Sequence, residues 1–196
     1  MDNNYTPLMK EVLRDAEIEA KYCLAKDIST DHLMSSLLSQ DSECFHINML
    51  YEMGLDVSVL KQEVDSICEA ETERAVGEAG PSSSKIQESL TRTLEASENY
   101  NKVMGGAEAT AKKLDIDIAP EHLMYHIFSL DSLLYKGLIE DLGYMDYEEF
   151  LEDLLSSISN AFSKVIKYGA ADGDDAIIAA LKQSGMSISD IDEELS

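Results

Sequence analysis

The chain has 196 residues, and 44% of them are hydrophobic, which is enough for a core in one domain or in two small ones. Its formal net charge of −24 would be repelled by the phosphates of nucleic acids and by anionic membranes, so neither is expected as a partner. Basic partners would be attracted, or the charge only keeps the protein soluble. Three prolines and ten glycines interrupt the chain, so the composition predicts an all-α fold.

The cysteines and the start of the chain bear on the compartment. Cys23, Cys44 and Cys68 are odd in number and form no CxxC pair, so we expect free thiols in a reducing compartment. The first residues lack the basic start and apolar stretch of a signal peptide. No apolar run is long enough to span a membrane. These features predict a cytoplasmic protein.

Residues 1–70 contain four helical patterns. Thr6 and Pro7 suit the N-cap and the first position of a helix. A second helix is expected over residues 31–39, and a third ends at Gly54, a natural terminator. A fourth follows, with apolar residues at helical spacing on one face: Val57, Leu60, Val64 and Ile67.

The second half shows the same kind of pattern. Its first helix is expected to begin at Ile86 and to break or kink at Gly105 and Gly106. Another helix opens at Pro120, and the next ends at Gly143. A last helix follows, whose capping box is formed by Asp146 and Glu149.

The two halves match at an offset of about 90 residues. Residues 30–34 share an acid-His-Leu-Met core with residues 120–124, and residues 49–54 match residues 138–143. Such an ordered series indicates a duplication. One four-helix unit alone would have a small core, so we expect the two units to pack together, with a pseudo-twofold arrangement as the natural result.

The duplication divides the chain into four segments. A first repeat over 1–70 and a second over 85–158 are joined by a linker over 71–84, which is rich in small and polar residues. Residues 159–196 predict a C-terminal helix and an acidic tail that leads to a linker. The expected fold is therefore all-α, with about eight helices in two pseudo-symmetric repeats and a short helical extension.

The repeated motif resembles a known family. Glu19-Ala20-Lys21 followed by residues 28–33 resembles the N-terminal domain of the Clp-type AAA+ unfoldases, and residues 111–123 resemble it again. The likeness covers roughly residues 5–157. Both copies keep acid-His-Leu, which is closer to the ClpC or ClpA type. Ser29 stands where the family has glycine, and Ala119-Pro120 replaces its Gly-Thr.

The resemblance implies a non-catalytic domain that receives adaptor proteins and unfolded or tagged substrates. It would deliver them to a hexameric ATPase for proteolysis by a ClpP-type protease. The chain has no GxxxxGK[ST] phosphate loop, so it is not expected to be an enzyme or to need a cofactor. It is either the monomeric N domain of a longer ATPase or a stand-alone relative that regulates a Clp complex. An unrelated helical hydrolase or metal enzyme is disfavoured.

The resemblance also implies a binding site. The acid of each repeat, Asp31 and Glu121, would grip the guanidinium of a phosphoarginine tag or an adaptor through paired hydrogen bonds. Thr6 and Thr30 would complete this pocket. The same acids alternatively only favour the helix N-termini. His32 and His122 are expected to fix the junction between loop and helix rather than to catalyse a reaction.

No metal site is predicted. One ExxH element, Glu43 to His46, falls short of the two that di-iron bundles use, and His122 with His126 lacks the HExxH context. Cys23 and Cys68 lie on apolar helix faces and are expected in the core. An acidic run at residues 140–153 is either a solvated face or a dock for a basic adaptor.

Overall fold

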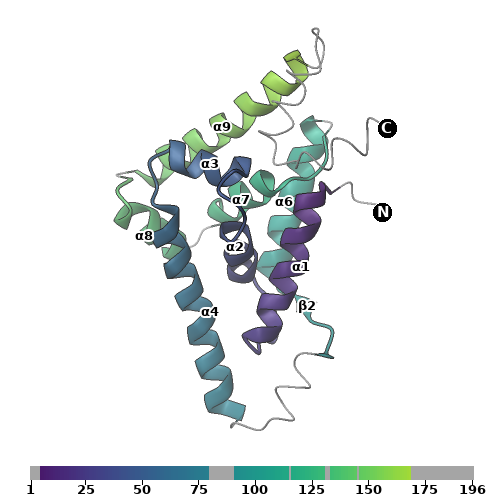
Figure 1. Ribbon diagram of the computed structural model, residues 1–196, viewed down its shortest axis with the longest axis vertical. Coiled ribbons are helices and arrows are strands. Elements are labelled where there is room, and N and C mark those ends of the chain that lie inside the picture. Colours follow the sequence, from purple (N-terminus) through teal and green to yellow (C-terminus); the bar gives the residue numbers. More distant parts are fainter. Residues whose placement is uncertain (1–4, 80–90, 115, 131–132, 145, 169–196) are drawn as a thin grey trace.

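The computed structural model describes residues 5–79, 91–114, 116–130, 133–144 and 146–168. This part of the chain is all-α, with eight helices and two strands of two residues each (Figure 1). The helices of the first repeat are α1 (Pro7–Tyr22), α2 (Thr30–Leu38), α3 (Phe45–Glu52) and α4 (Val57–Ala79). Those of the second are α6 (Glu98–Leu114), α7 (Pro120–Phe128), α8 (Leu133–Asp141) and α9 (Tyr147–Tyr168).

Equivalent helices of the two repeats begin and end in the same way. The Thr6 hydroxyl accepts a hydrogen bond from the Met9 N–H at 3.2 Å at the start of α1, and the Ser97 hydroxyl accepts one from the Tyr100 N–H at 3.1 Å before α6. The turns after α3 and α8 contain Gly54 at φ 84° and Gly143 at φ 106°. Only glycine adopts such values without strain, which is why both helices stop there.

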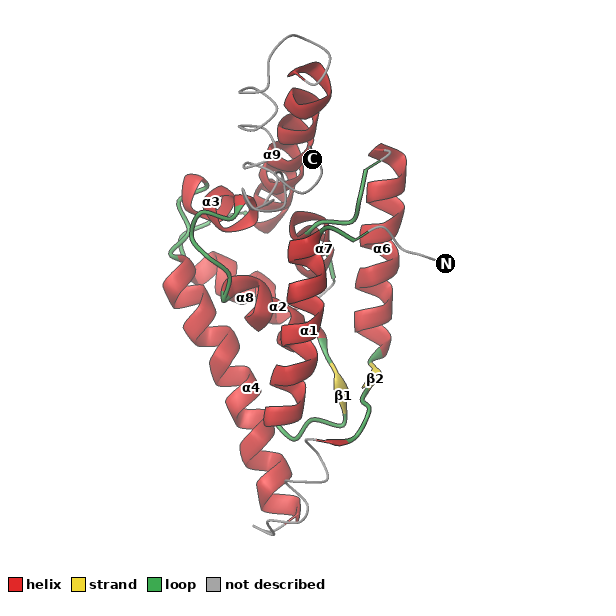
Figure 2. Cartoon of the chain, turned by 45° about the vertical axis from the view of Figure 1, so that its right-hand side comes forward, coloured by secondary structure: helices red, strands yellow, loops and turns green. Residues whose placement is uncertain are grey.

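The two repeats are joined by short parallel strand pairings. β1 (Asp27–Ile28) lies parallel to β2 (Glu95–Ala96), and Asp27 faces Glu95 (Figure 2). Tyr5 makes a second parallel bridge with Ile118. This bridge corresponds to the Ile28–Ala96 pair, since residues 5 and 96 are 91 apart and residues 28 and 118 are 90 apart. Each repeat therefore pairs the segment before its first helix with the segment before the second helix of the other, which is a pseudo-twofold arrangement.

The core is continuous through both repeats. Helices α2 and α7 pack against each other at its centre and are buried along almost their whole length (Figure 1). Phe128 of α7 makes edge-to-face contacts with Phe150 and Tyr135, at ring distances of 5.1 and 5.7 Å. Because the same apolar cluster takes in residues of both repeats, they form one domain.

Two features of α6 differ from the prediction. The helix does not break at Gly105 and Gly106, and it begins at Glu98 because the residues before it pair as β2 with the first repeat. A Cβ at Gly106 would lie 2.5 Å from the Nδ1 of His126, whereas one at Gly105 would meet nothing within 4 Å. Gly106 thus allows the close packing of α6 on α7, and this packing offsets the low helix propensity of the glycine pair.

Two helices extend past the expected C-terminal ends of their repeats. Helix α4 extends through the first nine residues of the expected linker, and α9 continues ten residues past position 158. Residues 80–90, which include the expected helix start at Ile86, and the tail over 169–196 lie outside the described residues. No helix in the described part of the chain combines the length and the apolar character that a membrane crossing requires.

Candidate functional site

The two repeated histidines hold the junctions that precede α2 and α7. The Nδ1 of His32 accepts a hydrogen bond from the Ser29 N–H at 3.0 Å, and the Nδ1 of His122 accepts one from the Ala119 N–H at 3.0 Å. Both side chains are buried. Burial, followed by the nearby His126, lowers the pKa of His122 to about 4, so this imidazole is neutral at physiological pH. Each histidine thus satisfies a backbone donor at the entry to a central helix.

Asp31 lies in the first turn of α2 and is held by the other repeat. The hydroxyl of Tyr135, in α8, donates a hydrogen bond to the Asp31 Oδ1 at 2.9 Å. Burial, followed by the charge of Asp31, raises the pKa of Tyr135 well above 10, so the hydroxyl keeps its proton. The Asp31 carboxylate is half-buried, so it combines a fixed orientation with partial access to solvent. No sequence motif points to Tyr135, and its place in the repeat is the one signal that could have identified it.

Glu121 occupies the equivalent place in α7 but is in a different state. Its side chain is fully buried, and neither carboxyl oxygen has a hydrogen-bond partner within the described ranges. Burial raises the pKa of Glu121 to about 8, so the carboxyl is largely protonated at neutral pH. Helices α3 and α8 match at an offset of 89 residues, as residues 49–54 and 138–143 do, so the residue equivalent to Tyr135 is His46 of α3, and α3 packs against α7. The first repeat therefore has no hydroxyl at the position from which Tyr135 binds Asp31.

The two threonines of the expected pocket adjoin different repeats: Thr30 is next to Asp31, and Thr6 is next to the segment before Glu121. Thr30 is the buried first residue of α2 and adjoins Asp31. Thr6 caps α1, and its N–H donates to the carbonyl of Ile118 at 3.1 Å, in the segment that leads into α7. The strand exchange thus brings Thr6 beside the segment that precedes Glu121.

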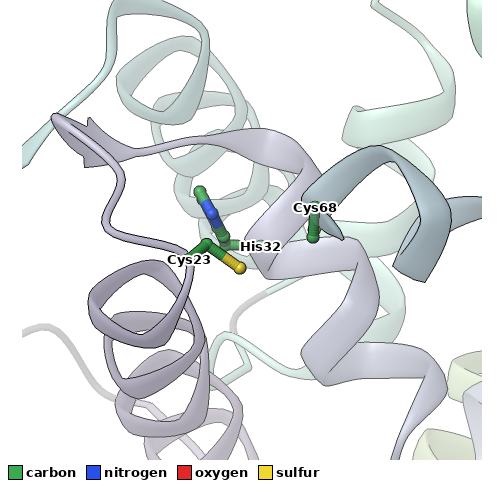
Figure 3. A group of neighbouring side chains, drawn as sticks. All are labelled: Cys23, His32 and Cys68. Carbon is green, nitrogen blue, oxygen red and sulfur yellow. The ribbon is translucent and has the colours of Figure 1, made fainter. Parts of the chain in front are cut away.

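Three side chains of the kinds that bind metal ions, Cys23, His32 and Cys68, lie close together (Figure 3). The ligand atoms of Cys23, His32 and Cys68 are all within 4.8 Å of one another, and all three residues are buried. The Nε2 of His32 also lies 3.6 Å from the Oε2 of Glu71. The sequence correctly placed both cysteines in the core but did not bring them together, because they belong to helices far apart in the chain.

The ExxH element is not arranged as a metal site. His46 is buried, and its Nε2 is 3.1 Å from the carbonyl oxygen of Leu37, to which it donates in the neutral ring. Burial lowers the pKa of His46 to about 4. His126 contacts the Thr110 hydroxyl at 2.8 Å instead of a second ligand. Within the described ranges, Cys23, His32 and Cys68 are the grouping suited to a metal ion.

Comparison with solved structures supports the same fold. A chain from a structural study titled "Preliminary structural investigations of a malarial protein secretion system" is 18% identical, with a TM-score of 0.63, and the match covers 83% of this chain and 97% of that chain. The N-terminal domain of the caseinolytic protease associated chaperone ClpD from Arabidopsis thaliana is 20% identical, with a TM-score of 0.51, and the match covers 80% and 95%.

Sequence comparison identifies the family. No curated protein matches the chain significantly. The model of the Clp repeat (R) N-terminal domain matches residues 4–141, which is more than half of the chain and includes both acid-His-Leu motifs. This match agrees with the internal duplication and the exchanged strands. The chain therefore belongs to the Clp repeat N-terminal domain family.

Proposed function

We propose that this chain is a non-catalytic recognition domain that receives protein substrates or adaptors for a Clp-type ATP-dependent unfoldase in the cytoplasm. The observation that carries the proposal is the family match over residues 4–141, which contains both repeats and both acids. In this proposal the domain acts by non-covalent binding and delivery. The acidic surface of the chain favours partners with positively charged groups.

The binding site of this proposal lies at the start of α2. The half-buried Asp31 carboxylate is held by Tyr135, so it is oriented before a ligand arrives. A guanidinium group, as in phosphoarginine, would bind such a carboxylate through charge-assisted hydrogen bonds. Glu121 is a poorer acceptor, because it is fully buried and largely protonated at neutral pH. The proposal therefore makes the two halves unequal, with Asp31 as the stronger contact and Thr6 and Thr30 as neighbours.

Calorimetry with phosphoarginine and with a phosphoarginine-tagged peptide tests this site. We expect Asp31→Asn to weaken binding about tenfold or more, since hydrogen bonds to charged groups contribute about 1.5–3 kcal/mol. Glu121→Gln should have a smaller effect, and the Asp31→Ala, Glu121→Ala double variant should abolish binding. Asp15→Asn, on exposed α1 surface, is the control for loss of one charge. A folded wild-type chain that binds neither ligand would remove phosphoarginine from the proposal.

A stand-alone protein that regulates or assembles a Clp complex is the alternative function. The family match supports both functions equally, because it concerns this domain only. Reading the coding sequence beyond Ser196 separates them. A phosphate-binding loop downstream would identify the N domain of an ATPase, and a stop codon would identify the stand-alone protein.

A further inference from the structure

We infer that Cys23, His32 and Cys68 form a binding site for a thiophilic divalent metal ion of the Zn²⁺ class, with the Glu71 carboxylate as fourth ligand. The three inner residues come from three helices that meet at one point. Cys23 is the C-cap of α1, His32 lies in the first turn of α2, and Cys68 lies in α4. Their side chains face one another across this junction (Figure 3).

The spacing of the donor atoms suits such an ion. All three ligand atoms lie within 4.8 Å of one another. In a tetrahedral zinc site, with Zn–S distances of about 2.3 Å and Zn–N of about 2.0 Å, the ligand atoms are roughly 3.5–4 Å apart. A contraction of up to about 1.3 Å therefore completes the inner part of the site. Thiolate, imidazole and carboxylate are all ligands that zinc accepts, and two cysteines with one histidine form a known three-residue zinc set.

Glu71 supplies both the fourth ligand and the route of entry. Its Oε2 is 3.6 Å from the His32 Nε2, and its side chain is 38% exposed, whereas that of His32 is 0% exposed. An ion can therefore reach the buried sulfurs from the side of Glu71. Glu19 stands next to the site as well, because its Oε1 accepts a hydrogen bond from the Cys23 thiol at 3.8 Å. This second carboxylate adds negative charge that favours a cation.

The Ser29 hydroxyl allows His32 to act as a ligand. The Nδ1 of His32 accepts the Ser29 N–H, which leaves the proton on Nε2. The Ser29 Oγ is also only 2.8 Å from Nδ1 and can accept a proton from it. In the other tautomer, Nδ1 donates to the Ser29 Oγ in place of accepting the Ser29 N–H, and the Nε2 lone pair is available to a metal ion. Ala119 stands in the corresponding position before His122 and offers no such acceptor.

The second repeat shows that the fold does not require this cluster. His122 makes the same backbone hydrogen bond as His32. The residue equivalent to Cys23, at the offset of 91 that relates Thr6 to Ser97, is Leu114, and the residue 90 positions after Cys68 is Ile158. Neither residue carries sulfur. The junction histidine therefore works without thiols, and the two cysteines need a reason other than helix capping.

Titration of the purified full chain with Co²⁺ and Zn²⁺, under a non-thiol reductant, tests the inference. We expect one equivalent of metal by elemental analysis, a thiolate-to-cobalt charge-transfer band, and a rise in melting temperature with added Zn²⁺. Cys23→Ser and Cys68→Ser should each weaken binding by more than the roughly 10–100-fold that loss of a second-shell partner costs. Glu71→Gln should weaken binding but keep the charge-transfer band.

The controls separate loss of a ligand from loss of the fold. Cys44→Ser removes a thiol outside the cluster and should leave the affinity unchanged. Cys68→Val keeps an apolar side chain where the second repeat has Ile158, so it should fold yet lose the metal. A folded, reduced wild-type chain that binds no metal would overturn the inference, as would binding that survives the Cys23→Ser, Cys68→Ser double variant. A Cys23–Cys68 disulfide in a protein that takes up no metal when reduced would also overturn it and identify a redox pair.

Discussion

The protonated state of Glu121 predicts an unusual dependence of stability on pH. Its pKa is raised from 4.5 to about 8 in the folded chain because the carboxyl is buried. The folded state therefore holds this proton more tightly than the unfolded state between these two values. The stability contribution is fully present below pH 4.5 and is lost as the pH rises through 8. This loss has the opposite sign to the usual acid destabilisation by a salt-bridged carboxylate.

The size of the effect follows from the pKa difference. Each pH unit between the two pKa values costs about 1.4 kcal/mol, so ionisation lowers the free energy of unfolding by roughly 3 kcal/mol at pH 7 and roughly 4 kcal/mol at pH 8. Glu121 is 0% exposed, so screening by solvent does not reduce this figure. Glu121→Gln keeps the shape of the side chain and removes the ionisation. The free energy of unfolding of this variant, relative to that of the wild type, should rise by about 3 kcal/mol between pH 5 and pH 8.

Urea unfolding of both proteins at pH 5, 6, 7 and 8 measures this difference. The comparison between the two is needed because His46 and His122, with pKa values lowered to about 4, make both proteins less stable as the pH falls below 6.5. The buried amide of the variant adds a constant that does not change with pH. Glu148→Gln, in the exposed first turn of α9, controls for the removal of one charge. A wild-type-to-variant difference that stays flat from pH 5 to 8 would refute a buried, protonated Glu121.

Two further substitutions test the packing between the repeats, both by urea unfolding. Tyr135→Phe should lower the free energy of unfolding by about 1.5–3 kcal/mol, because it removes the hydrogen bond to the Asp31 carboxylate. The control is Tyr144→Phe, which should cost well under 1 kcal/mol because the Tyr144 hydroxyl bonds an exposed acid at 3.3 Å. Equal costs would contradict the role of Tyr135. Gly106→Ala should destabilise by about 1–3 kcal/mol, because its Cβ would lie 2.5 Å from the imidazole on α7, and Gly105→Ala should stabilise by up to about 1 kcal/mol. The reverse order for the two glycines would show that α6 and α7 are less closely packed.

Features set by local chemistry were predicted from the sequence. The Thr6 cap and the glycine turns after α3 and α8 depend on residues close in the chain, so their signals are local. The duplication could also be read, because residues 30–34 and 120–124 keep one pattern of side chains. The family match agrees with the resemblance carried by those segments.

Features set by contacts between distant segments were missed. The helix expected from Ile86 was predicted to continue without a break into the region of α6, but β2 pairs with β1 ahead of Glu98, and a two-residue strand has no periodicity to detect. The kink expected at Gly105 and Gly106 is absent because α7 packs closely on α6 at Gly106, which has no Cβ to hold the two helices apart. Local sequence can show that a glycine weakens a helix, but only the partner helix determines whether close packing restores it.

The duplication also explains why the two halves of the chain depend on each other. The Asp31 carboxylate of the first repeat is oriented by Tyr135 of the second, and β1 of the first is completed by β2 of the second. Residues 1–70 alone would leave that carboxylate without its donor and the β1 backbone without its partner strand. Once such exchange is established, the copies are free to diverge around it. One copy then carries an oriented acid with the thiol cluster, and the other carries a buried, neutral Glu121.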